Sequence, residues 1–258
     1  MNFELNILFD WFYANKLSLN VTKSNYMVFS NAKNMMNNKI IKINKCIVEQ
    51  KPFIKFLGIH LDEKLSWSMH IKTCCTRIAG SIYVIKRIKR LIPKNYIRIL
   101  YFSLVHPYLS YGIPIWGSAY NVHIKKLIIM QKKAIRIIAG VNYNDHTDPL
   151  FHQLNILKLN DIYHAEVAKM IYQFKQNTLP LPLKTLFITN REIHDRPTRQ
   201  QHDLHLKKCR TTLATQHISS RGPHIWNNLP KDIKSVTSLN IKTFTKNIIA
   251  HFVRAYGT

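Results

Sequence analysis

One long stretch of this chain combines apolar residues at helical spacing with charges of a single sign. Residues 64–144 contain no Asp or Glu in 81 positions, and they contain 14 Lys or Arg. One apolar stripe consists of Ile71, Cys75, Ile78, Ile82 and Ile85. Most basic residues of this segment fall off the stripe, so the pattern predicts amphipathic helices with an apolar face toward a core and a basic face toward solvent.

The same periodicity predicts several further helices. They are expected over residues 3–16, 96–105, 121–139 and 161–174, with shorter ones over 223–228 and 240–253. Pro107 is expected to end the helix over 96–105. Residues 108–116 contain Gly112 and Pro114 and are expected to form a loop or a short irregular segment.

Strands are expected only near the N-terminus. Short β-branched and aromatic runs occur at 24–30, 40–48 and 53–61, and Asn37-Asn38 suggests a turn between the first two. The predicted fold is therefore α+β and predominantly α. We expect a small strand-containing region over 1–66, a helical region over 67–180 and a basic C-terminal region over 181–258, with the last boundary at Pro180 and Pro182.

The net charge of the chain points to a polyanionic partner. It is +25, from 38 Lys or Arg against 13 Asp or Glu. A charge of this size destabilises a compact chain unless a polyanion offsets it. Codon bias toward A and T would raise the Lys content but would not remove Glu. The alternative is a basic scaffold or membrane-surface binding protein, but a helix that binds a membrane surface carries Trp and Phe on its apolar face, whereas these stripes are rich in Ile.

The residue types that build catalytic or metal centres are scattered. No Asp-Asp pair occurs, and Asp62-Glu63 are the only adjacent acids. Two-metal phosphoryl transfer needs converging carboxylates. Four residues form the spacing H-x7-H-x2-H-x3-C, namely His194, His202, His205 and Cys209. Basic neighbours oppose a cation there, so we expect no metal and no cofactor in this chain.

Several separated motifs follow one another in a recognisable order. They are WFYANKLSLNVTKSNYMVF (11–29), FLGIHLDEKLSWSMH (56–70), Tyr111-Gly112, Trp116-Gly117, QKKAIR (131–136), RPTRQ (196–200), Gly222-Pro223 and WNNLP (226–230). Together they resemble the C-terminal part of the reverse transcriptases of non-LTR (LINE-type, jockey-like) retrotransposons. The resemblance covers nearly the whole chain.

The resemblance assigns each region a role in such a polymerase. Residues 1–66 would be the part of the palm after the catalytic strand, 67–180 the thumb and 181–258 the C-terminal region. The family's Tyr/Phe-Ala-Asp-Asp turn lies just before the segment that matches Trp11, and this chain has no such turn. The isolated chain is therefore expected to be inactive, and Mg²⁺ is expected only for the full-length enzyme. Lys23 would lie beside the departing pyrophosphate of that enzyme.

The resemblance and the charge pattern together define the candidate binding residues. Those expected to contact nucleic acid are Phe56, Leu57 and Gly58 of a primer-grip-like hairpin, and Lys72, Arg77, Lys86, Arg87, Lys89, Arg90, Lys125, Lys126, Lys132, Lys133 and Arg136 of the helices. The expected partners are RNA and DNA as a primer–template hybrid, with no membrane and no small-molecule substrate. With four cysteines, no C-x-x-C, and no signal peptide or apolar span, an intracellular location, cytoplasmic and nuclear, is expected.

Overall fold

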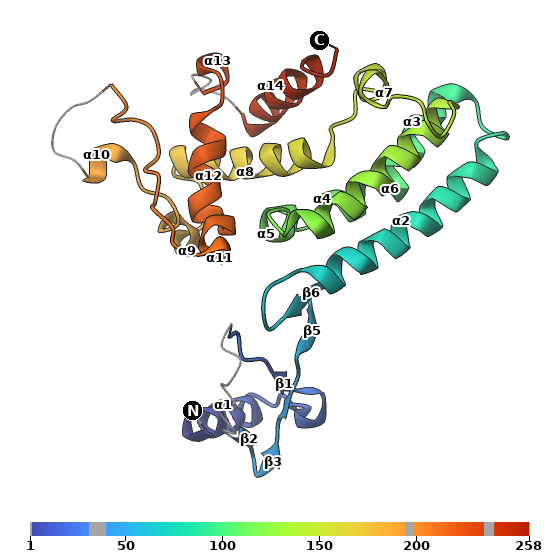
Figure 1. Ribbon diagram of the computed structural model, residues 1–258. Helices are drawn as coiled ribbons and strands as arrows, with labels where there is room; N and C mark the ends of the chain where they lie inside the picture. The colour runs from blue at the N-terminus through green and yellow to red at the C-terminus, as the bar shows by residue number, and fades with distance from the viewer. Residues whose placement is uncertain (1, 31–39, 194–198, 235–239, 258) are drawn as a thin grey trace. The chain divides into compact units, whose positions relative to one another are not determined.

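A computed structural model describes residues 2–30, 40–193, 199–234 and 240–257 of the chain (Figure 1). The chain divides into two compact units, residues 1–70 and 71–258. Each unit is described by itself. Within the described residues the elements are mostly helices, and the strands are short, which confirms an α+β fold that is predominantly α.

Unit 1 contains one long helix and three small sheets. Its elements are α1 (Asn2–Ala14), the 3₁₀ turn η1 (Val21–Lys23), β1 (Asn25–Tyr26), β2 (Lys42–Ile43), β3 (Cys46–Ile47), β4 (Glu49–Gln50), β5 (Phe53–Phe56) and β6 (Ile59–Asp62). Strands β2 and β3 form an antiparallel hairpin, as do β5 and β6, whereas β1 pairs in parallel with β4. A small buried cluster of Ile41, Ile43 and Val48 holds α1 through Leu5 and Phe9.

The strand predictions for unit 1 are only partly right. Residues 40–48 are not one strand but a hairpin, because Asn44 and Lys45 take the left-handed backbone conformation and reverse the chain. Only Asn25–Tyr26 of the expected strand over 24–30 pairs, and its partner is β4. The turn expected at Asn37-Asn38 lies outside the described residues.

Unit 2 is built from helices. They are α2 (Ser68–Ile88, which begins at the end of unit 1), α3 (Lys94–Leu104), α4 (His106–Ser110), α5 (Ile113–Trp116), α6 (Asn121–Ala139), α7 (Asp148–Gln153), α8 (Leu159–Lys175), α9 (Leu181–Lys184), α10 (Asn190–Ile193), α11 (Thr212–Gln216), α12 (Ile218–Asn227), α13 (Lys231–Lys234) and α14 (Ile241–Arg254). Gly140 ends α6 in the left-handed conformation, which glycine adopts without steric cost.

Helix α8 is the centre of unit 2. Helices α12 and α14 pack on it, as do α4, α5 and α6 (Figure 1). The ring of Phe244 on α14 stacks on Tyr172 of α8, with 4.4 Å between the ring centroids. The ring of Trp226 on α12 also stacks on Phe244, with 6.1 Å between the ring centroids. The C-terminal helices are therefore part of the same core as α8, and the functional division at residue 181 stays a prediction.

One expected loop of unit 2 is helical. Residues 106–110 and 113–116 form α4 and α5, with Pro107 and Pro114 in their first turns. A proline in a first turn loses no helical hydrogen bond, so Pro107 begins a helix rather than merely ending the one before it. Gly112 takes a φ of 62°, which redirects the chain between the two helices.

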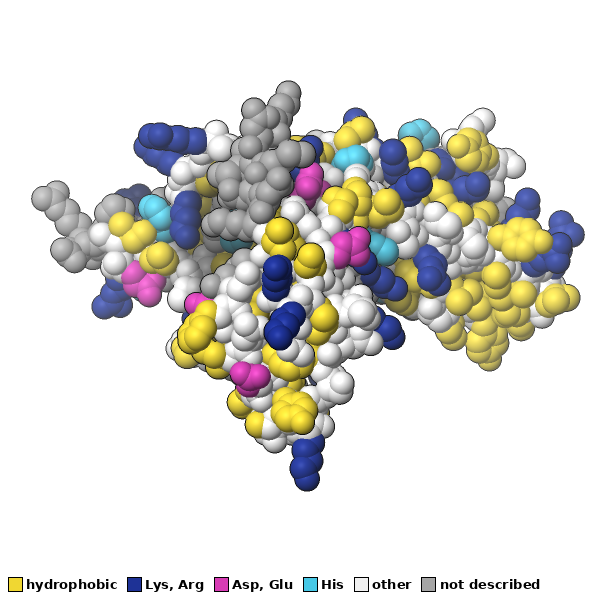
Figure 2. All heavy atoms as spheres, turned by 90° about the horizontal axis from the view of Figure 1, so that it is seen from below, with side chains coloured by type: hydrophobic (Ala, Val, Ile, Leu, Met, Phe, Trp, Pro, Cys, Tyr) yellow, Lys and Arg dark blue, Asp and Glu magenta, His cyan; other side chains and the backbone are white. Residues whose placement is uncertain are grey.

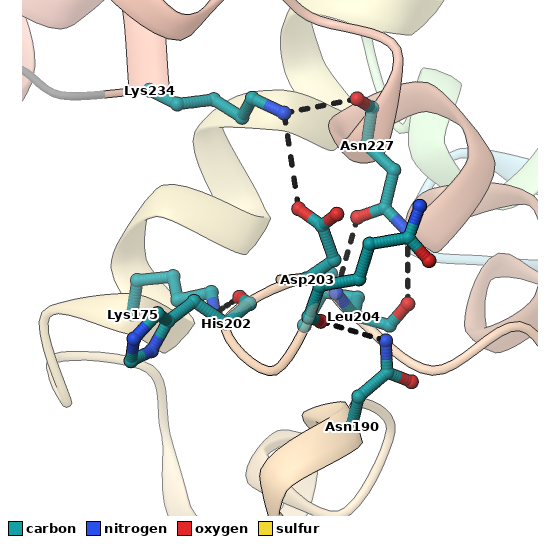
Figure 3. A network of polar contacts seen from close by, with 8 residues as sticks. Lys175, Asn190, His202, Asp203, Leu204, Asn227 and Lys234 are labelled. Atoms are coloured by element: carbon teal, nitrogen blue, oxygen red, sulfur yellow. Dashed lines mark hydrogen bonds and ion pairs between the residues drawn. The ribbon is translucent and has the colours of Figure 1, made fainter. Parts of the chain in front are cut away.

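A polar network fixes the segment before α11 to the end of α12 (Figure 3). The Asn227 side chain donates to the carbonyl of Leu204 (2.9 Å) and accepts from its N–H (3.1 Å). Lys234 Nζ donates to the Asn227 carbonyl (2.9 Å) and lies 3.9 Å from Asp203. This segment has little regular structure: Leu204 forms an isolated antiparallel bridge with Thr189, and the side-chain hydrogen bonds add to that backbone pairing.

Across the described residues, no helix combines the length and the apolar character needed to cross a bilayer.

Candidate nucleic-acid interface

Helix α2 separates its apolar and basic side chains as the sequence predicted. Ile71, Ile78 and Ile85 are fully or almost fully buried. The basic side chains that are exposed on this helix or just after it are Lys72, Arg77, Lys86, Arg87 and Arg90. The guanidinium of Arg87 lies over the exposed ring of Tyr83, 4.9 Å from its centroid, which presents a cation and a ring together.

Lys89 differs from the other candidates on this helix. It follows Ile85 by four residues and so falls on the apolar side, where it is half-buried. Its Nζ donates to the carbonyl of Ile137 in the last turn of α6, at 3.1 Å. A cation at that place satisfies a free helix carbonyl and offsets the partial negative charge of the helix end. Lys89 thus joins α2 to α6, and a contact to phosphate stays a prediction.

Helix α6 carries the second basic face. Its apolar side is buried through Ile124, Leu127, Ala134, Ile135 and Ile138. Lys125, Lys126 and Lys133 are exposed, and Lys132 is half-buried. Arg136 is also held, since its Nε donates to the carbonyl of Asp145 at 2.9 Å.

The two basic faces belong to neighbouring helices of unit 2. Burial raises the pKa of the Cys75 thiol on α2, and the charge of Lys126 on α6 partly opposes this rise, so the two groups lie within electrostatic reach. Among the described residues, no carboxylate makes an ion pair with any of the candidate cations of α2 and α6. Their positive charge is therefore not neutralised within the described chain. Figure 2 shows one face of the molecule, on which Lys and Arg side chains are widespread and acidic ones are few.

The hairpin β5–β6 places Phe56, Leu57 and Gly58 at its tip. Phe56 pairs with Ile59, and the two residues between them have φ angles of 45° and 83°, as a two-residue reverse turn requires. Phe56 is 61% exposed and Leu57 73% exposed. Both side chains are thus exposed at the tip, and Ile59 is the buried residue next to the turn, so a contact of Phe56 and Leu57 with nucleic acid stays a prediction.

Lys23 lies near this hairpin within unit 1. It ends the turn η1, is exposed, and lines an open cavity of about 430 Å³ together with Phe29, Ile54 and Phe56. The structure therefore brings the Lys23 side chain and the hairpin tip to one cavity. A role beside a leaving pyrophosphate stays a prediction for a full-length enzyme.

Asp62 is a structural residue that the sequence did not reveal as such. Its carboxylate is buried and accepts hydrogen bonds from the N–H groups of Lys64, Ser66 and Trp67, at 3.2, 2.9 and 2.9 Å. It also accepts from the Ser66 hydroxyl at 3.1 Å. These bonds fix the turn between β6 and α2, so this acid stabilises local structure.

Gln131 is the second such residue. It stands within the basic string of α6 but is 1% exposed. Its amide nitrogen donates to the Tyr101 hydroxyl (2.8 Å) and the Leu157 carbonyl (2.9 Å), and its oxygen accepts from the Leu159 N–H (2.9 Å). One side chain thus links α6, α3 and the start of α8. Burial raises the pKa of the Tyr101 hydroxyl, and the hydrogen bond from Gln131 partly opposes that effect.

Trp116 and Gly117, which form one of the sequence motifs, also have structural roles. Trp116 is completely buried, and its indole N–H donates to the Tyr111 carbonyl at 2.9 Å. A Cβ on Gly117 would lie 2.4 Å from the Tyr163 ring and 2.7 Å from the Ile113 carbonyl, so only glycine fits there. Burial explains both residues of this motif, and the sequence alone does not reveal that they are buried.

The histidines and the cysteine at 194–209 do not converge in the part of the chain that is described. His194 itself lies outside the described residues, as do residues 196–198 of the RPTRQ motif. Elsewhere in the described chain, no three His, Cys, Asp or Glu side chains are placed to hold one metal ion. Cys209 instead donates to the Ser220 hydroxyl, with 3.3 Å between sulfur and oxygen.

Comparison with known proteins gives several related sequences. The chain is 27% identical over 180 residues to the RNA-directed DNA polymerase from mobile element jockey of Drosophila melanogaster, covering 64% of this chain and 19% of that protein. It is 26% identical over 156 residues to the probable RNA-directed DNA polymerase from transposon X-element, covering 59% and 17%. It is 29% identical over 120 residues to the probable RNA-directed DNA polymerase from transposon BS, and this match covers 45% of this chain and 13% of that protein. Both of these are also from Drosophila melanogaster.

The chain thus spans about a fifth or less of the length of these curated relatives. No protein-family model matches it, and no solved structure matches it significantly. The relatives confirm the resemblance drawn from the motifs: the curated homologues of this chain are RNA-directed DNA polymerases of jockey, X-element and BS non-LTR retrotransposons.

Proposed function

We propose that this chain is a nucleic-acid-binding, C-terminal part of a retrotransposon reverse transcriptase that positions the primer–template. Its two basic helix faces, on α2 and α6, would hold the phosphates of an RNA–DNA hybrid. Its exposed hairpin tip at Phe56 and Leu57 would contact the primer strand. The isolated chain would bind without polymerising, because it has no Asp-Asp pair.

The observation that carries the proposal is the unpaired basic surface of α2 and α6. The cations project from rigid helices whose opposite faces are buried, and no described carboxylate pairs with them. Lys and Arg on rigid elements bind phosphates and release condensed counterions. Unpaired cations on two adjacent helices are suited to that role, and the homology to reverse transcriptases supports it.

The proposal is tested by the salt dependence of binding to an RNA–DNA hybrid. If about five to eight phosphates are neutralised, the logarithm of the association constant should fall with the logarithm of salt concentration with a slope of about −4 to −7. Fluorescence anisotropy with a labelled hybrid measures this slope. A slope near zero would contradict the proposal.

A pair of charge-matched variants localises the binding. Changing Lys125, Lys126 and Lys133 to Gln should weaken binding to all sequences alike and flatten the slope by up to roughly one unit per lost contact. The control changes Arg191, Lys231 and Arg254 to Gln, which removes the same charge from exposed positions outside α2 and α6. If both triple variants weaken binding equally, only net charge matters and the basic face is not an interface.

The expected lack of activity needs its own assay. Primer extension on a primed RNA template with Mg²⁺ or Mn²⁺ should give no product with the purified chain. Template-dependent incorporation that follows the chain through purification would overturn this part of the proposal.

A further inference from the structure

We propose that a cavity in the C-terminal part of unit 2 binds a single nucleotide of an unpaired strand through its phosphate. This goes beyond the proposed function, because the cavity shares no residue with the basic faces of α2 and α6 named above. It assigns the C-terminal helices a contact with single-stranded nucleic acid.

The cavity has the size of a ligand site. Its volume is about 840 Å³, and ligand pockets generally have about 300–1,000 Å³. It is formed where α8, α11, α12, α14, the start of α6 and the segment before α11 meet. These helices pack on one another, so the cavity belongs to the core framework of unit 2 rather than to a single loop.

The charged side chains that line the cavity, Lys207 and Arg221, are both basic. The lining also includes His164, His224 and His251, and no carboxylate is among the described residues that form it. Arg221 and Lys207 are exposed, and neither makes an ion pair with a carboxylate of the described chain. Cations that converge on a cavity without a carboxylate between them attract an anion.

One carboxylate, that of Asp161, lies next to a lining residue without lining the cavity itself. Asp161 is 3.8 Å from the imidazole of His164, but its carboxylate also accepts the hydrogen bond from the Tyr256 hydroxyl. Burial lowers the pKa of His164, and Asp161 and Arg221 oppose each other in their effects on it. Arg221 therefore acts electrostatically on His164. A bound phosphate would reduce the repulsion between the Arg221 guanidinium and a protonated His164 imidazole.

The remaining lining fits a nucleotide better than a bare ion. Hydroxyl groups of Thr212 and Ser220 line the cavity and can donate to phosphate oxygens, whereas that of Thr215 donates to the Thr212 carbonyl at 2.7 Å. The ring of Tyr120 lines the cavity and is 41% exposed, and Phe252 is half-buried in the lining. Bases of single strands stack on rings of this kind. A phosphate with its base would use both parts of the lining.

Alkylation of Cys209 gives a local readout in the full chain. Cys209 lines the cavity, whereas Cys46 is an exposed thiol of unit 1 and serves as an internal control. A 5′-phosphorylated tetrathymidylate at saturation should slow alkylation of Cys209 by iodoacetamide at least fivefold and leave Cys46 unchanged, as measured by peptide mass spectrometry. Inorganic phosphate at the same concentration should slow it less than twofold.

Three results would overturn the proposal. An unchanged rate at Cys209 would show that the strand does not enter the cavity. Equal slowing at Cys46 would show non-specific coating. Equal protection by inorganic phosphate would show a simple anion site that does not recognise a strand.

Charge-matched variants test the role of the cations. The double variant Lys207→Gln and Arg221→Gln should bind the tetrathymidylate at least about tenfold more weakly and lose the protection of Cys209. The control, Arg191→Gln with Lys231→Gln, removes the same charge outside the cavity and should change affinity less than threefold. Equal losses in both would contradict a specific site.

Two further measurements keep this test separate from that of the proposed function. Circular dichroism melting shows whether the cavity variant is folded. If it is not folded, the protection of Cys209 from alkylation in the unsubstituted chain still tests the cavity proposal. The folded cavity variant should bind the RNA–DNA hybrid within about threefold of its control. Loss of hybrid binding in the α6 triple variant alone would affect the proposed function and leave the cavity proposal standing.

Discussion

The two units differ in how much of their structure is fixed by a buried core. In unit 1 the main buried cluster has three residues, Ile41, Ile43 and Val48, and α1 buries no residue completely. Phe3, Ile7 and Trp11 lie on α1 with 76%, 54% and 55% of their surface exposed. Unit 2 instead buries large side chains completely, among them Trp116, Tyr101, Phe151 and Phe244.

This difference has a consequence for stability and for function. Burial of apolar surface is the main stabilising contribution to folding, so unit 2 should keep its structure under conditions in which unit 1 opens. The basic faces of α2 and α6 are attached to the well-packed unit, whereas the hairpin tip belongs to the weakly packed one. We therefore expect the helices to form a preformed surface and the hairpin to depend on local turn geometry.

The largest predicted effect comes from the core of unit 2. Trp116→Ala should lower the free energy of unfolding of unit 2 by about 3–5 kcal/mol, since a completely buried indole is replaced by a cavity. Hydrogen exchange of peptides from residues 95–175 should accelerate, while peptides from residues 40–66 should be unchanged. Equal acceleration in both units would show that they unfold together, and would contradict the claim that unit 2 is stabilised separately by its own core.

Gln131 should have the next largest effect. Gln131→Leu leaves the Leu157 carbonyl and the Leu159 N–H buried without their partner, and should destabilise unit 2 by about 3 kcal/mol. The matched control is Gln153→Leu at an exposed position at the end of α7, which should change stability by less than about 0.5 kcal/mol. Chemical denaturation measures both, and similar values would contradict the structural role of Gln131.

The stability of unit 1 should depend on pH through His70. Burial, and secondarily the charge of His60, lowers the pKa of His70 from its usual 6.5 to about 4. The neutral imidazole is thus favoured in the folded chain, and its stability contribution is present above pH 6.5 and lost as the pH falls toward 4. Between pH 7 and pH 5 the free energy of unfolding of unit 1 should fall by about 1.5 kcal/mol.

Local exchange rates are needed to measure this effect. His106 and His164 in unit 2 also have lowered pKa values because of burial, so a global melt would combine both units. Exchange of peptides from residues 40–66, corrected for the intrinsic rate, isolates unit 1. His70→Gln should remove most of the pH dependence there, and a dependence that persists would assign it to another group.

The smallest predicted effect is at the hairpin tip. Leu57 takes a left-handed φ of 45°, which suits Asn far better than Leu. Leu57→Asn should therefore stabilise unit 1 by about 0.5–1 kcal/mol, because Asn-Gly is the preferred sequence of such a turn. If the tip contacts nucleic acid, the same change should weaken hybrid binding. A variant that is both more stable and binds equally well would remove Leu57 from the interface.

The sequence by itself determined the features that depend on local periodicity and on charge. The stripe from Ile71 to Ile85 predicted α2, and the pattern over 121–139 predicted α6 with the correct C-terminal residue, because a helix places every third or fourth side chain on one face. The absence of acids between 64 and 144, with the basic residues off the apolar stripes, predicted basic helix faces toward solvent. The ordered motifs alone indicated the class of polymerase to which the homologues belong.

Only the tertiary structure decided what depends on contacts between distant residues. The parallel pairing of β1 with β4 and the burial of Gln131 within a basic string depend on partners more than 20 residues away. The same holds for Lys89, which lies on the apolar side of α2 but contacts a carbonyl of α6. The C-terminal cavity likewise combines residues from 119 to 252. Periodicity tells which face of an element is buried, but it does not tell which other element covers that face.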